Sequence, residues 1–227
     1  MAPPVIGLPA IRAMLFLLLL PSAVPAQQAP PRYLYIYRDS LKGGVDSDYR
    51  AIEEDAARIC AAFKCPNPYL GLESLSGPHE AWWINGFTSV ADTTRVVRAY
   101  AANRPLMQAL DSVAKRKASL IGTPVQGFGV LRPELSRGRA WAVAGARFAV
   151  VTVTRSRRPA QGSVWEVADS TLYVFRPART RRRAAALARE YGGRVFAIRL
   201  TWSMPAPEWV AADPDFWRIA PAAKTRH

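Results

Sequence analysis

The order of alternating and helical segments constrains this chain more than any other feature of its sequence. The stretch "RYLYIYR" alternates strictly between aliphatic and aromatic or charged side chains, a pattern typical of a strand with one buried face. Apolar residues at helical spacing follow it, and the turn residues of "SGPH" separate the next two alternating runs. The sequence predicts strands at 32–38, 69–75, 80–87 and 124–131, and helices at about 46–63, after Ser89 and from Pro105.

This β-α-β-β-α-β order is that of ferredoxin-like folds, in which helices cover one face of an antiparallel sheet. The other face needs a partner, and the second half of the chain supplies a β-β-β-α-β order in which the basic loop "SRRPAQG" replaces the first helix. The predicted fold class is α+β, with two ferredoxin-like halves, 32–135 and 136–203, that have antiparallel sheets and helices outside. Packed face to face, they would form an arrangement like a dimeric α/β-barrel within one chain.

The first 26 residues predict a signal peptide (1–26). Arg12 precedes the apolar run "AMLFLLLL", and "VPA" ends at Ala26 with the small residues that a signal peptidase recognises. The run is too short for a membrane span, which needs about 20 apolar residues. We therefore expect a periplasmic or secreted protein with a disordered linker at 27–31. We also expect a Pro- and Trp-containing C-terminal tail at 204–227 that folds back over the barrel.

The two cysteines, Cys60 and Cys65, stand in "RICAAFKCPNPY" at the predicted end of the first helix. In an oxidising compartment, two neighbouring cysteines favour a disulfide that closes a short loop. Zinc is the alternative, but no second Cys or His pair accompanies them, so we expect a disulfide and no metal.

The chain carries a net charge of +14, and most of the excess lies in its second half. Residues 136–227 hold 17 basic and 6 acidic side chains, concentrated in "TRSRRP" and "RPARTRRRAA". Such patches can bind anionic lipid, polysaccharide or nucleic acid. Because an exported protein seldom meets nucleic acid, we expect no nucleic-acid partner and at most a weak contact with an anionic envelope surface.

Three stretches carry a family resemblance: "YLYIYR", "YRAIEEDAARI", and a Trp-bearing third strand that runs into "SVADTTRVVRAY". Over about residues 32–132 they resemble the dimeric α/β-barrel superfamily, in particular its antibiotic-biosynthesis-monooxygenase-like domains. The resemblance implies a cofactor-free, quinone-forming oxygenase, a haem-degrading enzyme or a relative of no known activity. Haem-degrading members use a histidine on a helix, and no predicted helix here contains one. The resemblance carries over Trp83 and Asn85 as site residues and no cofactor.

Strand parity groups the candidate site residues. Side chains alternate along a strand, so Trp83, Asn85 and Phe87 share one face, and the tyrosines of the neighbouring strands have the matching parity. We expect the aliphatic parity to face the helices and this aromatic and polar parity to face the barrel lumen. The predicted ligand-binding residues are Tyr35, Tyr37, Tyr69, Trp83, Asn85 and Phe87.

An aromatic wall with a few polar groups is typical of a small-molecule pocket, and internal packing of the same residues is the alternative. Trp83, Asn85 and Glu73 are the candidates for catalysis, Glu73 as a base if burial raises its pKa. The hypotheses are a protein that binds a small aromatic ligand, a cofactor-independent monooxygenase acting on an aromatic or quinol substrate in the lumen, and an envelope protein that binds anionic surfaces through its Arg-rich half. Monomer and homodimer both stay open.

Overall fold

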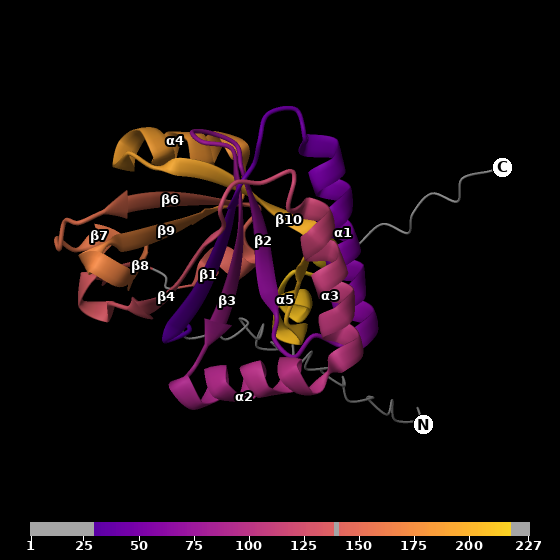
Figure 1. Ribbon diagram of the computed structural model, residues 1–227. Helices are drawn as coiled ribbons and strands as arrows, with labels where there is room; N and C mark the ends of the chain where they lie inside the picture. The colour runs from indigo at the N-terminus through magenta and orange to yellow at the C-terminus, as the bar shows by residue number, and fades with distance from the viewer. Residues whose placement is uncertain (1–29, 139–140, 219–227) are drawn as a thin grey trace, which may run out of the picture.

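The computed structural model describes residues 30–138 and 141–218, and eight antiparallel strands of this part of the chain close into a barrel (Figure 1). Around the barrel the strand order is β1-β3-β2-β10-β6-β9-β8-β4, and β4 pairs again with β1. The barrel strands are β1 (Tyr33–Ser40), β2 (Tyr69–Ser74), β3 (Glu80–Phe87), β4 (Val125–Leu131), β6 (Phe148–Thr154), β8 (Ser163–Glu166), β9 (Leu172–Ala178) and β10 (Arg194–Met204). A parallel two-stranded ribbon consists of β5 (Ser136–Arg137) and β7 (Ala160–Gln161).

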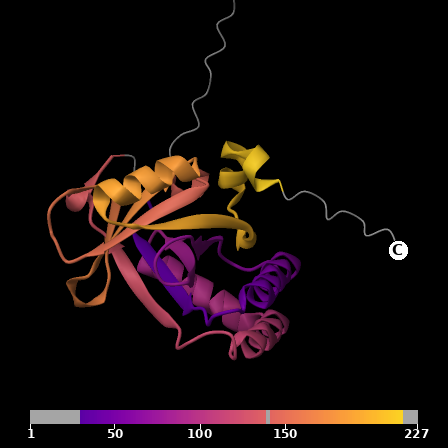
Figure 2. The ribbon, with the colours of Figure 1, turned by 90° about the horizontal axis from the view of Figure 1, so that it is seen from above.

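Helices cover the outer face of the barrel (Figure 1, Figure 2). Helices α1 (Asp46–Phe63), α2 (Val90–Ala102) and α3 (Arg104–Lys117) pack together, with α1 against β10 and α2 against β3, and α4 (Arg181–Tyr191) covers β6, β9 and β10. Helices α5 (Pro207–Ala212) and α6 (Pro214–Trp217) follow the last strand, and single-turn 3-10 helices occupy Pro133–Leu135, Ala142–Gly145 and Ala168–Ser170. In the part of the chain that the structure describes, every helix is too short or too polar to cross a membrane. The α+β class with a closed barrel agrees with the prediction.

Side chains at the helix ends explain where these helices begin and end. The Ser89 hydroxyl accepts a hydrogen bond from the Asp92 backbone N–H at 3.0 Å and caps the start of α2, as expected for a helix that begins after Ser89. The Asn103 side chain accepts from the Leu106 N–H at 3.2 Å and begins α3 in the same way. Gly192, with a φ of 64°, ends α4 in the left-handed conformation that glycine adopts without strain.

The barrel interior is a packed core. Each strand sends alternate side chains inward, and the bulkiest of these, Trp82, Trp165 and Phe175, are at most 1% exposed. The inward residues of the first three strands are Leu34, Ile36, Leu70, Leu72, Trp82 and Ile84. Among the described residues these side chains form one buried cluster with Phe175 and Phe196, both 0% exposed, so they fill the barrel interior.

The predicted assignment of faces is therefore wrong, although the parity that groups the residues is right. The aliphatic parity fills the lumen, and the aromatic and polar parity faces the helices. The physical reason is that the dry interior of a narrow barrel offers no water to tyrosine hydroxyls or asparagine amides, and buried polar groups without partners are costly. The monooxygenase hypothesis placed its substrate site in the lumen, where the described inward side chains pack against one another instead.

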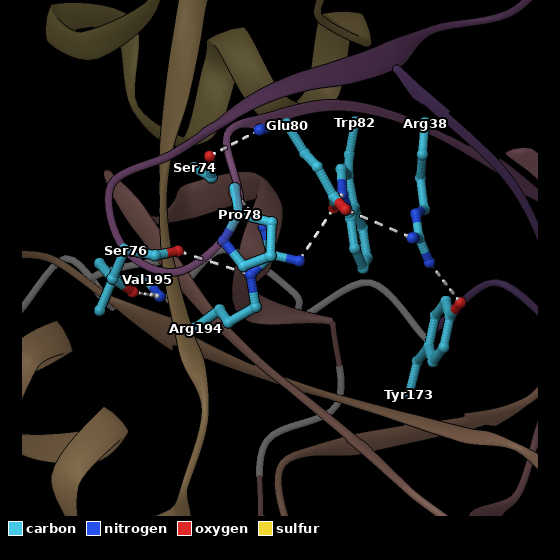
Figure 3. A network of polar contacts seen from close by, with 9 residues as sticks. All are labelled: Arg38, Ser74, Ser76, Pro78, Glu80, Trp82, Tyr173, Arg194 and Val195. Atoms are coloured by element: carbon cyan, nitrogen blue, oxygen red, sulfur yellow. Dashed lines mark hydrogen bonds and ion pairs between the residues drawn. The ribbon is translucent and has the colours of Figure 1, made fainter. Parts of the chain in front are cut away.

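One end of the barrel interior is closed by a polar network around Glu80 (Figure 3). Glu80 Oε2 accepts hydrogen bonds from Trp82 Nε1 at 2.6 Å and from Arg194 Nη1 at 2.9 Å. Arg38 Nη1 donates to the Tyr173 hydroxyl at 2.8 Å, and the Arg38 guanidinium lies 4.8 Å from the centre of the Trp82 ring. Burial favours a raised pKa for Glu80, but these hydrogen bonds and the charge of Arg38 outweigh it, and the pKa lies below its ordinary value.

The C-terminal segment folds back onto the barrel, as the sequence predicts. Trp217 is buried among the residues of the barrel core, and Trp209 and Phe216 pack against the same cluster. Arg147 Nη1 and Asp213 Oδ2, 2.8 Å apart, join the start of α6 to the body of the protein. The predicted signal peptide, most of the linker at 27–31 and the last residues of the predicted tail lie outside the described residues.

Candidate functional site

A cavity of about 870 Å³ lies between the outer face of β1–β4 and helices α1, α2 and α3. Ligand pockets in proteins occupy about 300–1,000 Å³, so this cavity is large enough for a multi-ring molecule. The structure brings all six residues that the sequence predicts as ligand-binding to its wall. They are Tyr35, Tyr37, Tyr69, Trp83, Asn85 and Phe87. We call this space the aromatic cavity.

The sheet side of the aromatic cavity is built of rings that pack against one another. The rings of Tyr37 and Trp83 meet edge to face with centres 5.7 Å apart, and those of Tyr35 and Phe128 lie 5.1 Å apart. Neighbouring strands place them together, because Tyr37 is paired with Trp83 across β1 and β3. The Asn85 amide oxygen accepts a hydrogen bond from Asn67 at 3.4 Å, which fixes a polar group within this wall.

One end of the aromatic cavity holds a buried ionic cluster. Lys117 Nζ lies 2.9 Å from Asp39 Oδ2 and 3.0 Å from Glu53 Oε1, and both carboxylates are almost fully buried. The Tyr49 hydroxyl donates to the same Asp39 oxygen at 2.8 Å. Lys117 Nζ also lies 4.7 Å from the centre of the Trp83 ring, a cation–π distance. Glu53 and Lys117 both line the cavity, so a ligand there meets an acid–base pair.

Burial and mutual charge shift the pKa values of this cluster. Burial raises the pKa of Glu53 above its ordinary value, and the charge of Lys117 offsets only part of the effect. Burial opposes the charge on Lys117, but the carboxylates of Glu53 and Asp39 outweigh it and raise its pKa. Burial also raises the pKa of Tyr37 to about 12, against the opposing charge of Lys117. Lys117 and Tyr37 therefore stay protonated at neutral pH, and the Glu53 carboxylate holds a proton more readily than an exposed glutamate does.

The mouth of the aromatic cavity is apolar. Val97 on α2 and Phe128 on β4 line the cavity and are 61% and 50% exposed. Large apolar side chains held in solvent beside a concave surface are typical of ligand-binding sites, because an occupant removes them from water. The cavity thus has an apolar entrance and a polar end.

Sequence reasoning missed Glu53 and Lys117, although each had a signal. Along α1, Glu53 lies four residues after the buried Tyr49, on the face that also holds Cys60. Along α3, Lys117 lies four residues after the buried Val113. A charged residue inside an apolar helical stripe needs a buried partner, and the two helices supply each other's partner here.

Glu73, the predicted catalytic base, does not line the aromatic cavity. Its buried carboxylate is held between Arg50 on α1 and Arg199 on β10, with Arg50 Nη2 at 2.6 Å from Oε1. Both carboxylate oxygens are therefore engaged by guanidinium groups. This arrangement joins α1 and β10 to β2, and it leaves the role of Glu73 in catalysis as a prediction without a place in the cavity.

The sulfur atoms of Cys60 and Cys65 lie at disulfide distance, as the sequence predicts. The bridge closes the C-terminal end of α1, where Lys64 takes the left-handed conformation, onto the segment that leads into β2. Cys60 lines the aromatic cavity, so the bridge also fixes part of its wall. The described residues contain no group of His, Cys, Asp or Glu side chains that could hold a metal ion.

Comparisons with known proteins give a likeness of shape and no family. No family model matches the sequence, and no curated protein matches it. Among solved structures, the chain is similar to a "putative monooxygenase" from Fusobacterium nucleatum, with a TM-score of 0.44 and 9% identity over 76% of this chain and 93% of that one. It is also similar to a "putative monooxygenase" from Lactobacillus acidophilus, with a TM-score of 0.43 and 9% identity over 74% and 93% of the two chains. At this level of similarity neither structure supports a function for this chain.

Proposed function

We propose that the protein binds a small, partly aromatic ligand in the aromatic cavity. The observation that carries the proposal is the cavity itself, which has aromatic walls and a buried ion pair, Glu53 and Lys117, at one end. Such a shape accepts a flat apolar body and orients it through one polar substituent. A hydroxyl or carbonyl group of the ligand would point to Glu53 and Lys117, and its ring would lie against Tyr37 and Trp83.

Isothermal titration with 1-naphthol, a two-ring phenol, tests this proposal. Val97→Trp places an indole at the cavity mouth and should weaken binding at least ten-fold, since Val97 is exposed and the substitution disturbs no packed core. The matched control is Val90→Trp, because Val90 is 64% exposed on the same helix and does not line the cavity. Equal affinities of both variants, or no binding by the natural protein, would contradict the proposal.

A second function, cofactor-independent oxygenation, is favoured by the position of Glu53. A phenol is more easily oxidised once it has lost its proton, and a buried carboxyl with a raised pKa is suited to take that proton. In the balanced reaction a hydroquinone and O₂ give a hydroxyquinone and water: one oxygen atom enters the ring and the other leaves as water. We propose this activity as the alternative to binding alone.

Oxygen consumption with a panel of hydroquinones distinguishes the two functions. If the protein is an oxygenase, Trp83→Phe, Asn85→Ala and Glu53→Gln should each slow consumption, and Glu53→Gln should lower the rate by a larger factor than it lowers 1-naphthol affinity. Glu54→Gln is the matched control, because Glu54 is the next residue of α1 and does not line the cavity. Consumption at the uncatalysed rate would leave the protein a binder.

We also propose an architecture of two ferredoxin-like halves and an exported protein. Support for the first is that neighbouring strands follow the order β4-β1-β3-β2 and then β10-β6-β9-β8, so the fourth, first, third and second strand of each half are adjacent. Support for the second is the disulfide-bonded pair, which is stable in oxidising compartments. Mass determination of the mature N-terminus would test cleavage after Ala26.

A further inference from the structure

A second cavity lies on the outer face of the barrel, away from β1–β4. It has a volume of about 350 Å³ and is bounded by β6, β9, the end of α4 and the loop between β6 and β8. Of the residues that the structure describes, three arginines line it, namely Arg137, Arg158 and Arg176, and no aspartate or glutamate does. We call this space the arginine cavity. It shares no lining residue with the aromatic cavity.

Arg176 is the buried member of the three. It is 5% exposed, its Nη1 donates to the Thr152 hydroxyl at 2.7 Å, and its guanidinium lies 4.4 Å from the centre of the Tyr191 ring. Its buried Nε has no hydrogen-bond partner. Within residues 30–138 and 141–218 no carboxylate forms an ion pair with Arg176, and Glu190 acts on it only through its charge at longer range. A buried guanidinium normally has an anionic partner, and this one lacks it.

The other buried or half-buried arginines show the normal arrangement. Arg147 is paired with Asp213, and Arg194 is paired with Glu80. On the loop above the arginine cavity, Arg157 is paired with Glu166 and does not line the cavity. The arginine cavity therefore differs from its surroundings in having cations without built-in anions.

Gly162 allows the backbone beside the arginine cavity to approach β9 closely. Gly162 has a φ of +115°, and a Cβ there would lie 2.5 Å from the Phe175 carbonyl oxygen and 2.9 Å from Arg176 Cγ. Only glycine lets the chain approach β9 so closely. The same approach pairs Arg137 with Gln161 across β5 and β7, which sets both residues at the edge of the cavity beside Arg176.

We propose that the arginine cavity binds a tetrahedral oxyanion, that is, a phosphate or sulfate group. Guanidinium groups donate paired hydrogen bonds that match the oxygens of such an anion, and hydroxyl groups of Thr154 and Ser156 line the same space. The anion would supply the negative charge that Arg176 lacks. The group can be free in solution or part of a lipid headgroup, because both present the same oxygens.

A defined oxyanion site differs from the expected contact between the Arg-rich half and an anionic surface, because it depends on particular arginines. A diffuse contact would depend on total charge, so any exposed arginine of the region would contribute to a similar extent. A defined site depends on Arg137, Arg158 and Arg176 and is saturable. The site also stands apart from the proposed aromatic ligand, so failure of either proposal leaves the other intact.

Isothermal titration calorimetry of the full chain with inorganic phosphate tests the proposal. Arg158→Gln and Arg137→Gln change exposed side chains at the cavity edge, and each should weaken phosphate binding by about ten-fold, the loss expected for one charged hydrogen bond. Arg155→Gln is the matched control, since it removes the same charge from the same loop outside the cavity and should bind like the natural protein. Gly162→Ala tests the backbone and should also weaken binding.

Sedimentation with vesicles distinguishes the two sources of the anion. Binding to phosphatidylglycerol vesicles, but not to phosphatidylcholine vesicles, that is lost in Arg158→Gln and kept in Arg155→Gln would assign the site to a lipid headgroup. Saturable phosphate binding with the same pattern and no vesicle binding would assign it to a free anion. The proposal is overturned if Arg155→Gln weakens binding as much as Arg158→Gln, or if neither phosphate nor the anionic vesicles bind.

Discussion

The aromatic cavity and the arginine cavity lie on different parts of the outer face of one barrel, and their buried cations differ in whether they have a carboxylate partner. In the aromatic cavity, the cation Lys117 is buried between two carboxylates of its own chain, Asp39 and Glu53. In the arginine cavity, Arg176 is buried without an ion-paired carboxylate among the described residues. Lys117 therefore has its counter-charges within the chain, whereas a counter-charge for Arg176 would come from a bound anion.

The difference follows from the segments that cover each face. Three helices cover the outer face of β1–β4, and two of them bring Glu53 and Lys117 together from their buried stripes. The arginine cavity is bordered by the segment from 155 to 162, which supplies Arg158 and no acid to its described lining. The strands set the shape of both cavities, and the covering segments set their chemistry.

The largest effect is expected from Lys117→Met, which removes the one cation that pairs with both Asp39 and Glu53. Two buried carboxylates would then face each other without a counter-charge, a change that costs about 3–5 kcal/mol in known cases. The free energy of unfolding in urea measures it. Lys115→Met, at an exposed position in the last turn of the same helix, should change stability by about 0.5 kcal/mol or less. A loss of stability below about 1 kcal/mol for Lys117→Met would mean that the two buried carboxylates do not depend on Lys117 as their counter-charge.

The pH dependence of two glutamates should have opposite signs. The pKa of Glu80 is lowered in the folded protein, so its stabilising contribution is present above 4.5 and is lost as the pH falls through the folded pKa. The pKa of Glu53 is raised, so its contribution is present below 4.5 and is lost as the pH rises through the folded pKa. Glu80→Gln should therefore cost most near neutral pH, about 2 kcal/mol, since it weakens charged hydrogen bonds. Glu53→Gln should cost less as the pH rises.

Urea unfolding of the natural protein and both variants from pH 3.5 to 8 measures this contrast. Glu54→Gln serves as the reference on α1. If the stability cost of Glu53→Gln and that of Glu80→Gln change with pH in the same direction, the prediction is wrong. Hydrogen bonds and opposite charges would then offset the burial penalty of the Glu53 carboxylate as fully as that of Glu80.

The sequence predicts the strands and most helix limits because periodicity is a local property. Expected and observed limits agree for the strand at Glu80–Phe87 and for the cap at Ser89. Parity likewise groups the six cavity residues, because alternation along a strand is fixed by backbone geometry. Which face becomes the lumen was not predictable from one strand, since it depends on how eight strands close and on the width of the resulting barrel.

The charged members of both cavities could not be predicted for a different reason. Asp39, Glu53 and Lys117 meet from three elements, and the sequence shows each as an isolated charge. Arg176 stands in a run of arginines that reads as a solvated surface, yet strand β9 turns this one toward the outer cavity and buries it. Both clusters are products of long-range contacts, which residue spacing alone does not encode.

The smallest effect is expected from Arg176→Met, the counterpart of Lys117→Met in the other cavity. The substitution removes a buried cation that no carboxylate of residues 30–138 and 141–218 pairs with, so it leaves no described buried carboxylate without its counter-charge. Methionine can keep the contact with Tyr191, and the Thr152 hydroxyl still reaches the Tyr191 carbonyl at 3.4 Å. We expect a cost of about 1 kcal/mol or less in low-salt buffer without phosphate.

Arg147→Met is the matched control for this last prediction, because it removes a guanidinium that is paired with Asp213 and should cost more. Phosphate should raise the melting temperature of the natural protein and leave that of Arg176→Met unchanged, since a ligand stabilises only a folded state that binds it. A cost for Arg176→Met as large as that for Lys117→Met would show that the arginine is neutralised within the chain. The two cavities would then balance their charges in the same way, and the contrast between them would be lost.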